Sequence, residues 1–176
     1  MKHSLELFEQ PIPTLRAPRP DDGARVALLS KNNRKQDFGA LLGELSDFDH
    51  FVNTSIIAEV NGEIVGAVLA YFPPYAPESL SIIQVVVGEK EENTGLGSLM
   101  LGQLMRRDVC AGINRVETTI NSCDEANWAL FRRFARWQRS HMEITPFFTQ
   151  ALQPHKRHEI DNHVTVRLSG EAKTAA

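Results

Sequence analysis

The segment Glu92-Asn93-Thr94-Gly95-Leu96-Gly97 carries two closely spaced glycines directly before an apolar run with helical spacing. The N-terminus of a helix exposes about four unpartnered N–H groups and a partial positive charge, and glycines let an anion approach that backbone closely. The loop could therefore bind a phosphate group. For a lone Gly-x-Gly a tight turn is the simpler explanation, and neither a Walker lysine nor the third glycine of a dinucleotide fingerprint follows. Nearby Glu89, Glu91 and Glu92 would also repel a phosphate unless they point away.

Histidine and cysteine side chains raise the question of a metal site. His155, His158 and His163 lie within nine positions, and three imidazoles could bind zinc. However, position 162 is asparagine, so the stretch is not His-Glu-x-x-His, and Pro154 indicates a loop. The two cysteines, Cys110 and Cys123, lack metal-type spacing. We therefore expect free thiols and no metal.

The composition of the chain limits its size class and its partners. With 176 residues and 42% apolar content, we expect one domain over residues 14–168, with loose termini at 1–13 and 169–176. The net charge of −3 gives no reason to expect nucleic acid or anionic lipid as a partner. No segment approaches the roughly 20 apolar residues of a membrane helix, and no signal peptide is evident. A cytoplasmic protein that binds a small molecule is expected.

The elements around the glycine loop can be predicted from periodicity. Residues 80–87 form a near-continuous apolar run, which predicts a central strand covered on both faces and ended by Gly88. Residues 96–105 have the spacing of an amphipathic helix. The loop is therefore expected to connect a buried strand to a helix.

Other patterns complete an alternating order of strands and helices. Asn61-Gly62 lies between two β-branched runs and predicts an antiparallel hairpin. Ser122 and Glu125 have the spacing of a capping box at the start of a helix. Residues 32–51 are compatible with helix or loop. Further strands are expected at 14–18, 115–120, 146–153 and 163–168, and helices at 19–31 and 122–137.

This order, with the glycine loop after a central strand, resembles the GCN5-related N-acetyltransferases (GNAT) from about Thr14 to Leu168. In that superfamily the central strand, the pyrophosphate loop and the following helix form the acetyl-CoA site. The usual loop is Gln/Arg-x-x-Gly-x-Gly/Ala, and here Glu92 stands where Arg or Gln is expected. The resemblance implies an α/β fold with a mixed, mostly antiparallel sheet flanked by helices, and acetyl-CoA as co-substrate.

Five stretches resemble more closely the diaminobutyrate acetyltransferases of ectoine biosynthesis. They are "RAPRPDDGA", "VNTSIIAEVNGEIVG", "AYFPPYAPESL", "ETTINSCDEANWALFRRFAR" and "PFFTQAL". The similarity implies acetylation of L-2,4-diaminobutyrate by a homodimer. The chain departs from that family at Ile83, where Trp is usual, at Asp124, where Asn is usual, and in a stretch of which it keeps only Asp37. A different small amine, or a non-catalytic relative that binds CoA, are the alternatives.

The resemblance also implies a set of cofactor contacts. Backbone N–H groups near Val85 and Val87 are expected to bind the cofactor arm and the thioester, while both side chains can also belong to the core. Arg132 and Arg133 could each meet a CoA phosphate or lie on a solvated helix face, and we select Arg133. The predicted cofactor contacts are Val85, Val87, Asn93, Thr94, Gly95, Leu96, Gly97, Asp124 and Arg133.

Acetyl transfer requires a neutral amine, a polarised thioester carbonyl and a proton for the departing thiolate. Since amines are mostly protonated near pH 7, a carboxylate is useful to bind the ammonium and then take its proton. The candidates are Asp37, Glu159 and Asp161, and Asp161 falls where the resemblance implies contact with the substrate amine. Each could instead be a solvated loop acid. The predicted substrate contacts are Asp37, Ile83, Gln84, His158 and Asp161.

The proton donor to the thiolate is not evident. Many GNAT enzymes use a tyrosine in the last helix, whereas the tyrosines of this chain are Tyr71 and Tyr75. Ser122, Cys123 or water could substitute, and Cys123 could support a covalent mechanism. A helix cap for Ser122 and a buried thiol for Cys123 are the more ordinary roles. We expect direct transfer.

Overall fold

The structure is a computed structural model that describes residues 11–29, 48–147 and 160–168. Its elements follow the predicted alternation of strands and helices. In chain order they are β1 (Thr14–Arg16), α1 (Asp22–Leu29), α3 (Phe48–Thr54), β2 (Ile56–Val60), β3 (Glu63–Tyr71), β4 (Ser79–Val87), η1 (Glu89–Glu91), α4 (Leu96–Met105), η2 (Asp108–Cys110), β5 (Arg115–Asn121), α5 (Glu125–Trp137), β6 (Met142–Phe147) and β7 (Asp161–Arg167).

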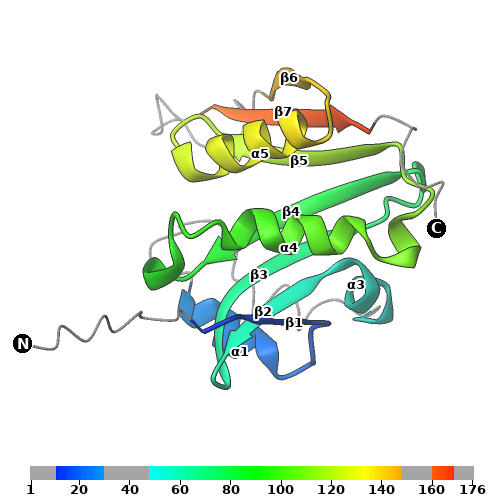
Figure 1. Cartoon of the computed structure of the whole chain (residues 1–176). Coiled ribbons are helices and arrows are strands. Elements are labelled where there is room, and N and C mark those ends of the chain that lie inside the picture. Colours follow the sequence, from blue (N-terminus) through cyan, green and yellow to red (C-terminus); the bar gives the residue numbers. More distant parts are fainter. Residues whose placement is uncertain (1–10, 30–47, 148–159, 169–176) are drawn as a thin grey trace, which may run out of the picture.

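The described strands form one seven-stranded sheet in the order β1-β2-β3-β4-β5-β7-β6 (Figure 1). Every neighbouring pair is antiparallel except β4 and β5, which are parallel. β4 is thus the central strand, as predicted, and it ends at Val87 immediately before Gly88. The prediction of a mixed, mostly antiparallel sheet is confirmed.

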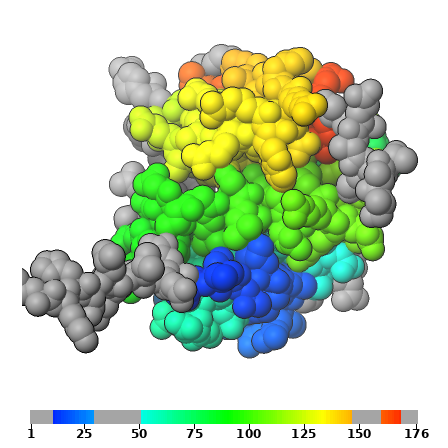
Figure 2. Space-filling model, viewed as in Figure 1, coloured from blue at the N-terminus to red at the C-terminus, as the bar shows by residue number. Residues whose placement is uncertain are grey.

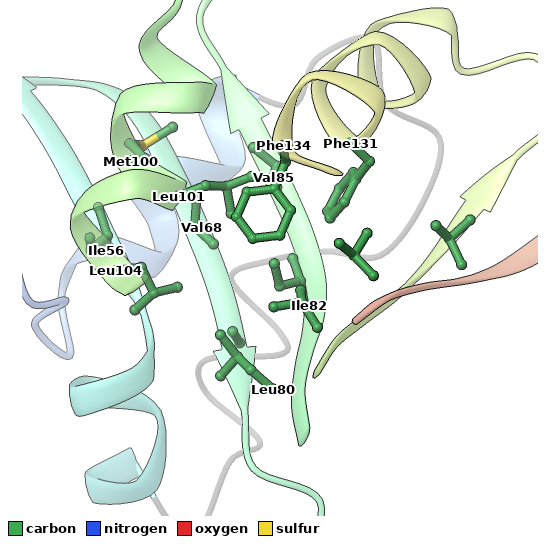
Figure 3. Close-up of a cluster of buried hydrophobic side chains, with 14 of the residues drawn as sticks. Ile56, Val68, Leu80, Ile82, Val85, Met100, Leu101, Leu104, Phe131 and Phe134 are labelled. Carbon is green, nitrogen blue, oxygen red and sulfur yellow. The ribbon is translucent and has the colours of Figure 1, made fainter. Parts of the chain in front are cut away.

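Helices cover the sheet on both faces. On one face, side chains of α4 and α5 pack over the strands in a core that includes Met100, Leu104 and Phe131 (Figure 3). On the other face, Val26 of α1 and Phe51 of α3 cover β2 and β3. Successive residues of a strand contribute their side chains to the two cores in alternation, because these side chains point to opposite faces of the sheet. Ile56, Ala58, Val68 and Ala70 belong to the first core, and Ile57, Ala67 and Leu69 to the second.

The hairpin between β2 and β3 has the predicted turn. Asn61 has φ of 50° and Gly62 has φ of 82°. A type I′ turn requires positive φ at both central residues, which Asn-Gly adopts at low cost. This local signal was sufficient to predict the pairing of the two strands.

β4 contains a bulge that the sequence did not reveal. Leu69 of β3 pairs with Gln84, but the next residue, Ala70, pairs with Ile82, so Ile83 is an extra residue in β4. Leu80 and Ile82 before the bulge and Val85 after it all enter the core beneath α4 and α5. The bulge therefore changes which positions of β4 face this core.

An ion-pair network ties α1 to the edge of the sheet. Asp22 is fully buried at the start of α1, and Arg16 of β1 donates to both of its carboxylate oxygens at 2.6 and 2.9 Å. Arg16 also donates to Glu59 of β2 at 2.8 and 3.0 Å. This one guanidinium group therefore joins three elements of the fold, β1, α1 and β2.

The start of α5 differs from the prediction. Asp124, not Ser122, caps the helix, because its Oδ1 accepts a hydrogen bond from the backbone N–H of Asn127 at 3.1 Å. The predicted Ser122 and Glu125 capping box is therefore wrong, and Ser122 Oγ instead accepts from the N–H of Ile160 at 3.3 Å. Cys123 is a free thiol as predicted, but it is exposed and not buried.

Two further segments considered in the sequence analysis are described only in part. β6 begins at Met142, earlier than the predicted strand at 146–153, and residues 148–153 lie outside the described residues. α3 is the described part of the segment in which helix and loop were both left open. None of the helices in the described ranges is both long and apolar enough to span a membrane.

Candidate functional site

β4 and β5 separate toward their C-terminal ends. Their parallel pairing runs from Ser79 and Arg115 only as far as Ile82 and Thr118. β4 continues to Val87 alongside β3, and β5 continues to Asn121 alongside β7. The sheet therefore opens between its central strands, and Figure 1 shows the two strands diverging toward the end where α4 and α5 begin.

A cleft of about 600 Å³ lies at this opening, on the face covered by α4 and α5. It is lined by the end of β4, by η1 and the glycine loop, by the first turn of α4, by α5 as far as Arg133, and by Leu29 of α1. Eight of the nine predicted cofactor contacts line it, namely Val85, Val87, Asn93, Gly95, Leu96, Gly97, Asp124 and Arg133. Residues from three separate parts of the sequence are thus brought together. Thr94 does not line the cleft, and its hydroxyl donates to the carbonyl of Glu91 at 2.7 Å.

The backbone of the glycine loop has two residues with positive φ. Asn93 has φ of 62° and Gly95 has φ of 88°, both in the left-handed region. Gly95 is the N-cap of α4, and its carbonyl accepts the first helical hydrogen bond, from Leu99 at 3.0 Å. The N–H groups of the first helical turn have no partner within the helix, and Leu96, Gly97 and Ser98 of this turn line the cleft. Such a nest of N–H groups suits an anion.

Close packing of α4 and α5 holds the two helix starts side by side. A Cβ atom at Gly97 would lie 3.3 Å from both terminal methyl groups of Leu130, so a glycine permits this approach. In Figure 2 the yellow surface of α5 lies directly against the green surface of α4. The cleft therefore has two helix N-termini at its wall, each carrying a partial positive charge.

The charged side chains at the cleft are nevertheless mostly acidic. Glu89, Glu91, Glu92, Asp124 and Glu125 line it together with Arg133. The carboxylate of Asp124 is held by the N–H and the Nδ2 group of Asn127 at 3.1 and 2.8 Å. Arg133 is thus the one cation among the described residues that line this cleft, while Arg132 lies over the ring of Trp128 at 5.7 Å.

Sequence reasoning missed Ser98 in the first turn of α4. It lines the cleft, and its Oγ atom is buried with no hydrogen-bond partner among the described residues. A buried hydroxyl normally has a partner. The available signal was its position, directly after the second glycine of the loop.

The opposite face of the opening is polar. Val116 and Ile120 of β5 enter the core beneath α5, so Thr119 and Asn121 point to the other face. Asp161 of β7 lies directly opposite Asn121, and His163 directly opposite Thr119. The Nδ2 group of Asn121 donates to Oδ1 of Asp161 at 3.0 Å. The predicted acid Asp161 is therefore at the end of the sheet where β4 and β5 separate.

The two residues of the β4 bulge also belong to this second face. Ile83 packs against the cluster beneath α1 and α3. Gln84 precedes the core residue Val85, and its Oε1 atom is buried without a hydrogen-bond partner among the described residues. The predicted substrate contacts Ile83, Gln84 and Asp161 therefore share one face, while the predicted cofactor contacts line a cleft on the other.

Several predicted residues cannot be placed. Asp37, His158, Glu159 and His155 lie outside the described residues. Within the ranges that the structure describes, no group of three or more His, Cys, Asp or Glu side chains could hold a metal ion.

Comparison with known proteins agrees with this geometry. The model of the Acetyltransferase (GNAT) family matches residues 19–135. L-2,4-diaminobutyric acid acetyltransferase of Methylotuvimicrobium alcaliphilum is 35% identical, with 90% of this chain and 89% of the relative covered. The enzyme of the same name from Shouchella clausii is 30% identical, with 89% and 87% covered.

A solved structure extends the similarity to three dimensions. The diaminobutyrate acetyltransferase of Paenibacillus lautus, in complex with L-2,4-diaminobutyric acid and coenzyme A, matches with a TM-score of 0.78 and 26% identity, covering 90% of this chain and 96% of that chain. A family model that matches from before α1 to within α5 spans the whole cofactor cleft described above. The chain therefore belongs to the acetyltransferase (GNAT) family.

Proposed function

We propose that this protein transfers an acetyl group from acetyl-CoA to an amino group of L-2,4-diaminobutyrate. The observation that carries the proposal is the opening between β4 and β5, which has a cleft with two helix N-termini on one face of the sheet and Asp161 on the other. The similarity over nine tenths of the chain to diaminobutyrate acetyltransferases supports this choice of substrate. It also supports a role in ectoine biosynthesis.

The residues of the cleft fit coenzyme A in three respects. The left-handed Asn93 and Gly95 and the free N–H groups of α4 suit the pyrophosphate. The buried Oγ of Ser98, which has no partner among the residues that the structure describes, suits a phosphate oxygen. The edge of β4 beyond Ile82, which has no β5 partner, offers backbone groups to the cofactor arm. When bound, the cofactor supplies the activated acetyl thioester.

On the polar face, we assign the amine to Asp161 and Gln84. A carboxylate binds the ammonium form and accepts its proton, directly or through water, and this yields the neutral nucleophile. The buried Oε1 of Gln84 is an acceptor that an ammonium N–H would satisfy. Asp37, Glu159 and His158 are further candidates for these tasks.

Direct transfer between the two ligands is the mechanism that we propose. Tyr71 packs against the ring of Phe51 with 5.8 Å between ring centroids, and neither Tyr71 nor Tyr75 lines the cleft. Ser122 Oγ is engaged with Ile160. Water is therefore our choice of proton donor to the thiolate. A covalent step at the exposed Cys123 is not required.

A second candidate substrate is a different small amine. Ile83 favours this alternative, because the isoleucine side chain leaves more room for a substrate than a larger aromatic side chain would. A non-catalytic role is favoured by the acidic lining of the cleft, which includes Glu92.

We also propose a cytoplasmic homodimer. β6 is an edge strand of the described sheet with Ile144 half exposed, and a second copy could cover it.

The test is the release of free thiol from acetyl-CoA by the purified protein, with and without diaminobutyrate, between pH 7 and 9. The rate is expected to depend on diaminobutyrate and to rise with pH as the amine loses its proton. Shorter and longer diamino acids serve as controls for specificity. Turnover with another amine alone would replace the substrate assignment, and absence of turnover with bound CoA would favour the non-catalytic role.

A further inference from the structure

Asn121 connects the polar face of the sheet to the turn that leads into α5. Its Nδ2 group donates a hydrogen bond to Oδ1 of Asp161 at 3.0 Å, and its Oδ1 accepts one from the backbone N–H of Cys123 at 3.0 Å. A backbone N–H is a donor only, so the amide oxygen must face Cys123 and the NH₂ group must face Asp161. The hydrogen-bond network thus fixes the orientation of the amide.

The backbone around this pair is also held. The indole N–H of Trp128 donates to the carbonyl of Asn121 at 2.9 Å. The N–H of Ser122 donates to the carbonyl of Ile160 at 2.8 Å, and Ser122 Oγ accepts from the N–H of Ile160. These bonds fix the end of β5 against the start of β7. With its backbone in place, the orientation of the Asp161 carboxylate depends on its side-chain torsions, which the Asn121 bond restrains.

We infer that Asn121 is a positioning residue for the amine substrate, because it holds the Asp161 carboxylate in the orientation that binds the ammonium group. This inference rests on the proposed function. An amide is suited to the task because it is neutral. It restrains the carboxylate without adding a positive charge, which a guanidinium donor would do.

The same side chain is linked to the cofactor side of the site. Cys123 is followed directly by Asp124, which caps α5 and lines the cleft. One amide therefore contacts the carboxylate assigned to the amine and the turn that begins the cleft wall. Substitutions at Asn121 must separate these two contacts if they are to test positioning.

Asn121→Asp makes this separation. It keeps the Oδ1 acceptor for Cys123 but replaces the donor that faces Asp161 by a second carboxylate oxygen. We expect kcat/KM for diaminobutyrate to fall about tenfold or more at pH 7, through a higher KM for the amine, with the KM for acetyl-CoA within about twofold. The acidic limb of the pH profile should move to higher pH, since two facing carboxylates bind a shared proton.

Asn114→Asp is the matched control, because Asn114 is exposed and precedes β5 at its opposite end. Within the described part of the chain, only its backbone N–H and carbonyl make hydrogen bonds, to Glu78 and Leu168. It should behave as the unaltered protein. If Asn121→Asp also behaves so, Asn121 only supports the turn, and the positioning role is overturned.

A double-mutant cycle with Asp161→Asn completes the test. If Asn121 acts through Asp161, then Asn121→Asp, which keeps the acceptor for Cys123, should lower kcat/KM in the Asp161→Asn background by no more than about twofold further. Independent, multiplicative losses would overturn the inference. A lack of diaminobutyrate turnover by the unaltered protein would instead refute the proposed function, and the inference with it.

Discussion

Gly66 of β3 lies directly beneath Met100 of α4. A Cβ atom at Gly66 would lie 3.0 Å from Met100 Cε, 3.1 Å from Leu96 Cδ2 and 3.2 Å from the carbonyl oxygen of Val86. The absence of a side chain therefore sets how closely the first half of α4 approaches the sheet. The N-terminus of this helix forms part of the cleft wall.

Gly66→Ala should destabilise the protein by about 1 to 3 kcal/mol, because the backbone oxygen of Val86 cannot move aside. The helix start should shift with it, so the KM for acetyl-CoA should also rise. Urea unfolding and initial rates measure the two effects. Gly112→Ala is the control, since its Cβ would meet no atom within 4 Å. Equal stability of the two variants would contradict this account of the packing.

Gly95→Ala tests the loop conformation. Gly95 has φ of 88° with open space around its missing Cβ, so the cost for alanine is backbone strain of about 1 kcal/mol and not a clash. Gly62 of the hairpin has φ of 82° and the same open space. We expect Gly62→Ala and Gly95→Ala to lose similar stability in thermal unfolding, while only Gly95→Ala weakens CoA binding in calorimetry. Weaker binding by both variants would mean that the loop has no special role.

Asp22 should make stability depend on pH. Burial alone would raise the pKa of Asp22, but the hydrogen bonds from Arg16 and from the N–H of Arg19, with the charges of Arg16 and Arg25, lower it below its usual value. The contribution of the carboxylate is therefore fully present above the unfolded-state pKa of about 3.9 and is lost as the pH falls through the lower folded-state value.

Asp22→Asn should accordingly lower the free energy of unfolding by about 2 to 3 kcal/mol at pH 7, and by progressively less below about pH 4. Urea titrations across this range give the difference at each pH. Asp21→Asn, at the exposed neighbouring position, is the control and should have little effect. A difference that is constant with pH would show that the carboxylate charge is not the cause.

Glu92→Gln should strengthen cofactor binding. Glu92 is exposed and lines the cleft, where it faces the phosphates in the proposed complex. Removing its charge is expected to lower the KM for acetyl-CoA about two- to fivefold at low salt. In the unaltered protein the KM should fall as KCl screens the repulsion. Glu63→Gln, far from the cleft in the β2–β3 hairpin, should leave the KM unchanged. A KM that rises with salt would contradict the prediction.

Features set by neighbouring residues were predictable from the sequence. The Asn61-Gly62 turn and the glycine loop depend on local backbone preferences, and both were found where expected. The predicted capping box is wrong because Asp124, and not Ser122, is the N-cap of α5. Which of these two residues becomes the N-cap depends on how the chain enters the helix. Propensity gives both residues a similar preference for that position.

Features set by strand register were not predictable. The bulge at Ile83 is hidden in an apolar run without period, yet it decides that Gln84 and Val85 face different sides of the sheet. The contact between Asn121 and Asp161 joins residues 40 positions apart through the pairing of β5 with β7. The hydroxyl of Ser98 is buried without a partner among the described residues, and this burial arises from the packing of the fold.

The separation of β4 and β5 beyond Ile82 and Thr118 also bears on the kinetic mechanism of the proposed reaction. In the proposed complex the nucleotide lies on the helix side and the amine on the polar side, so neither ligand has to leave before the other binds. Both can be bound at once, so initial-rate lines at varied acetyl-CoA should intersect rather than run parallel. CoA should then inhibit competitively against acetyl-CoA and not against the amine.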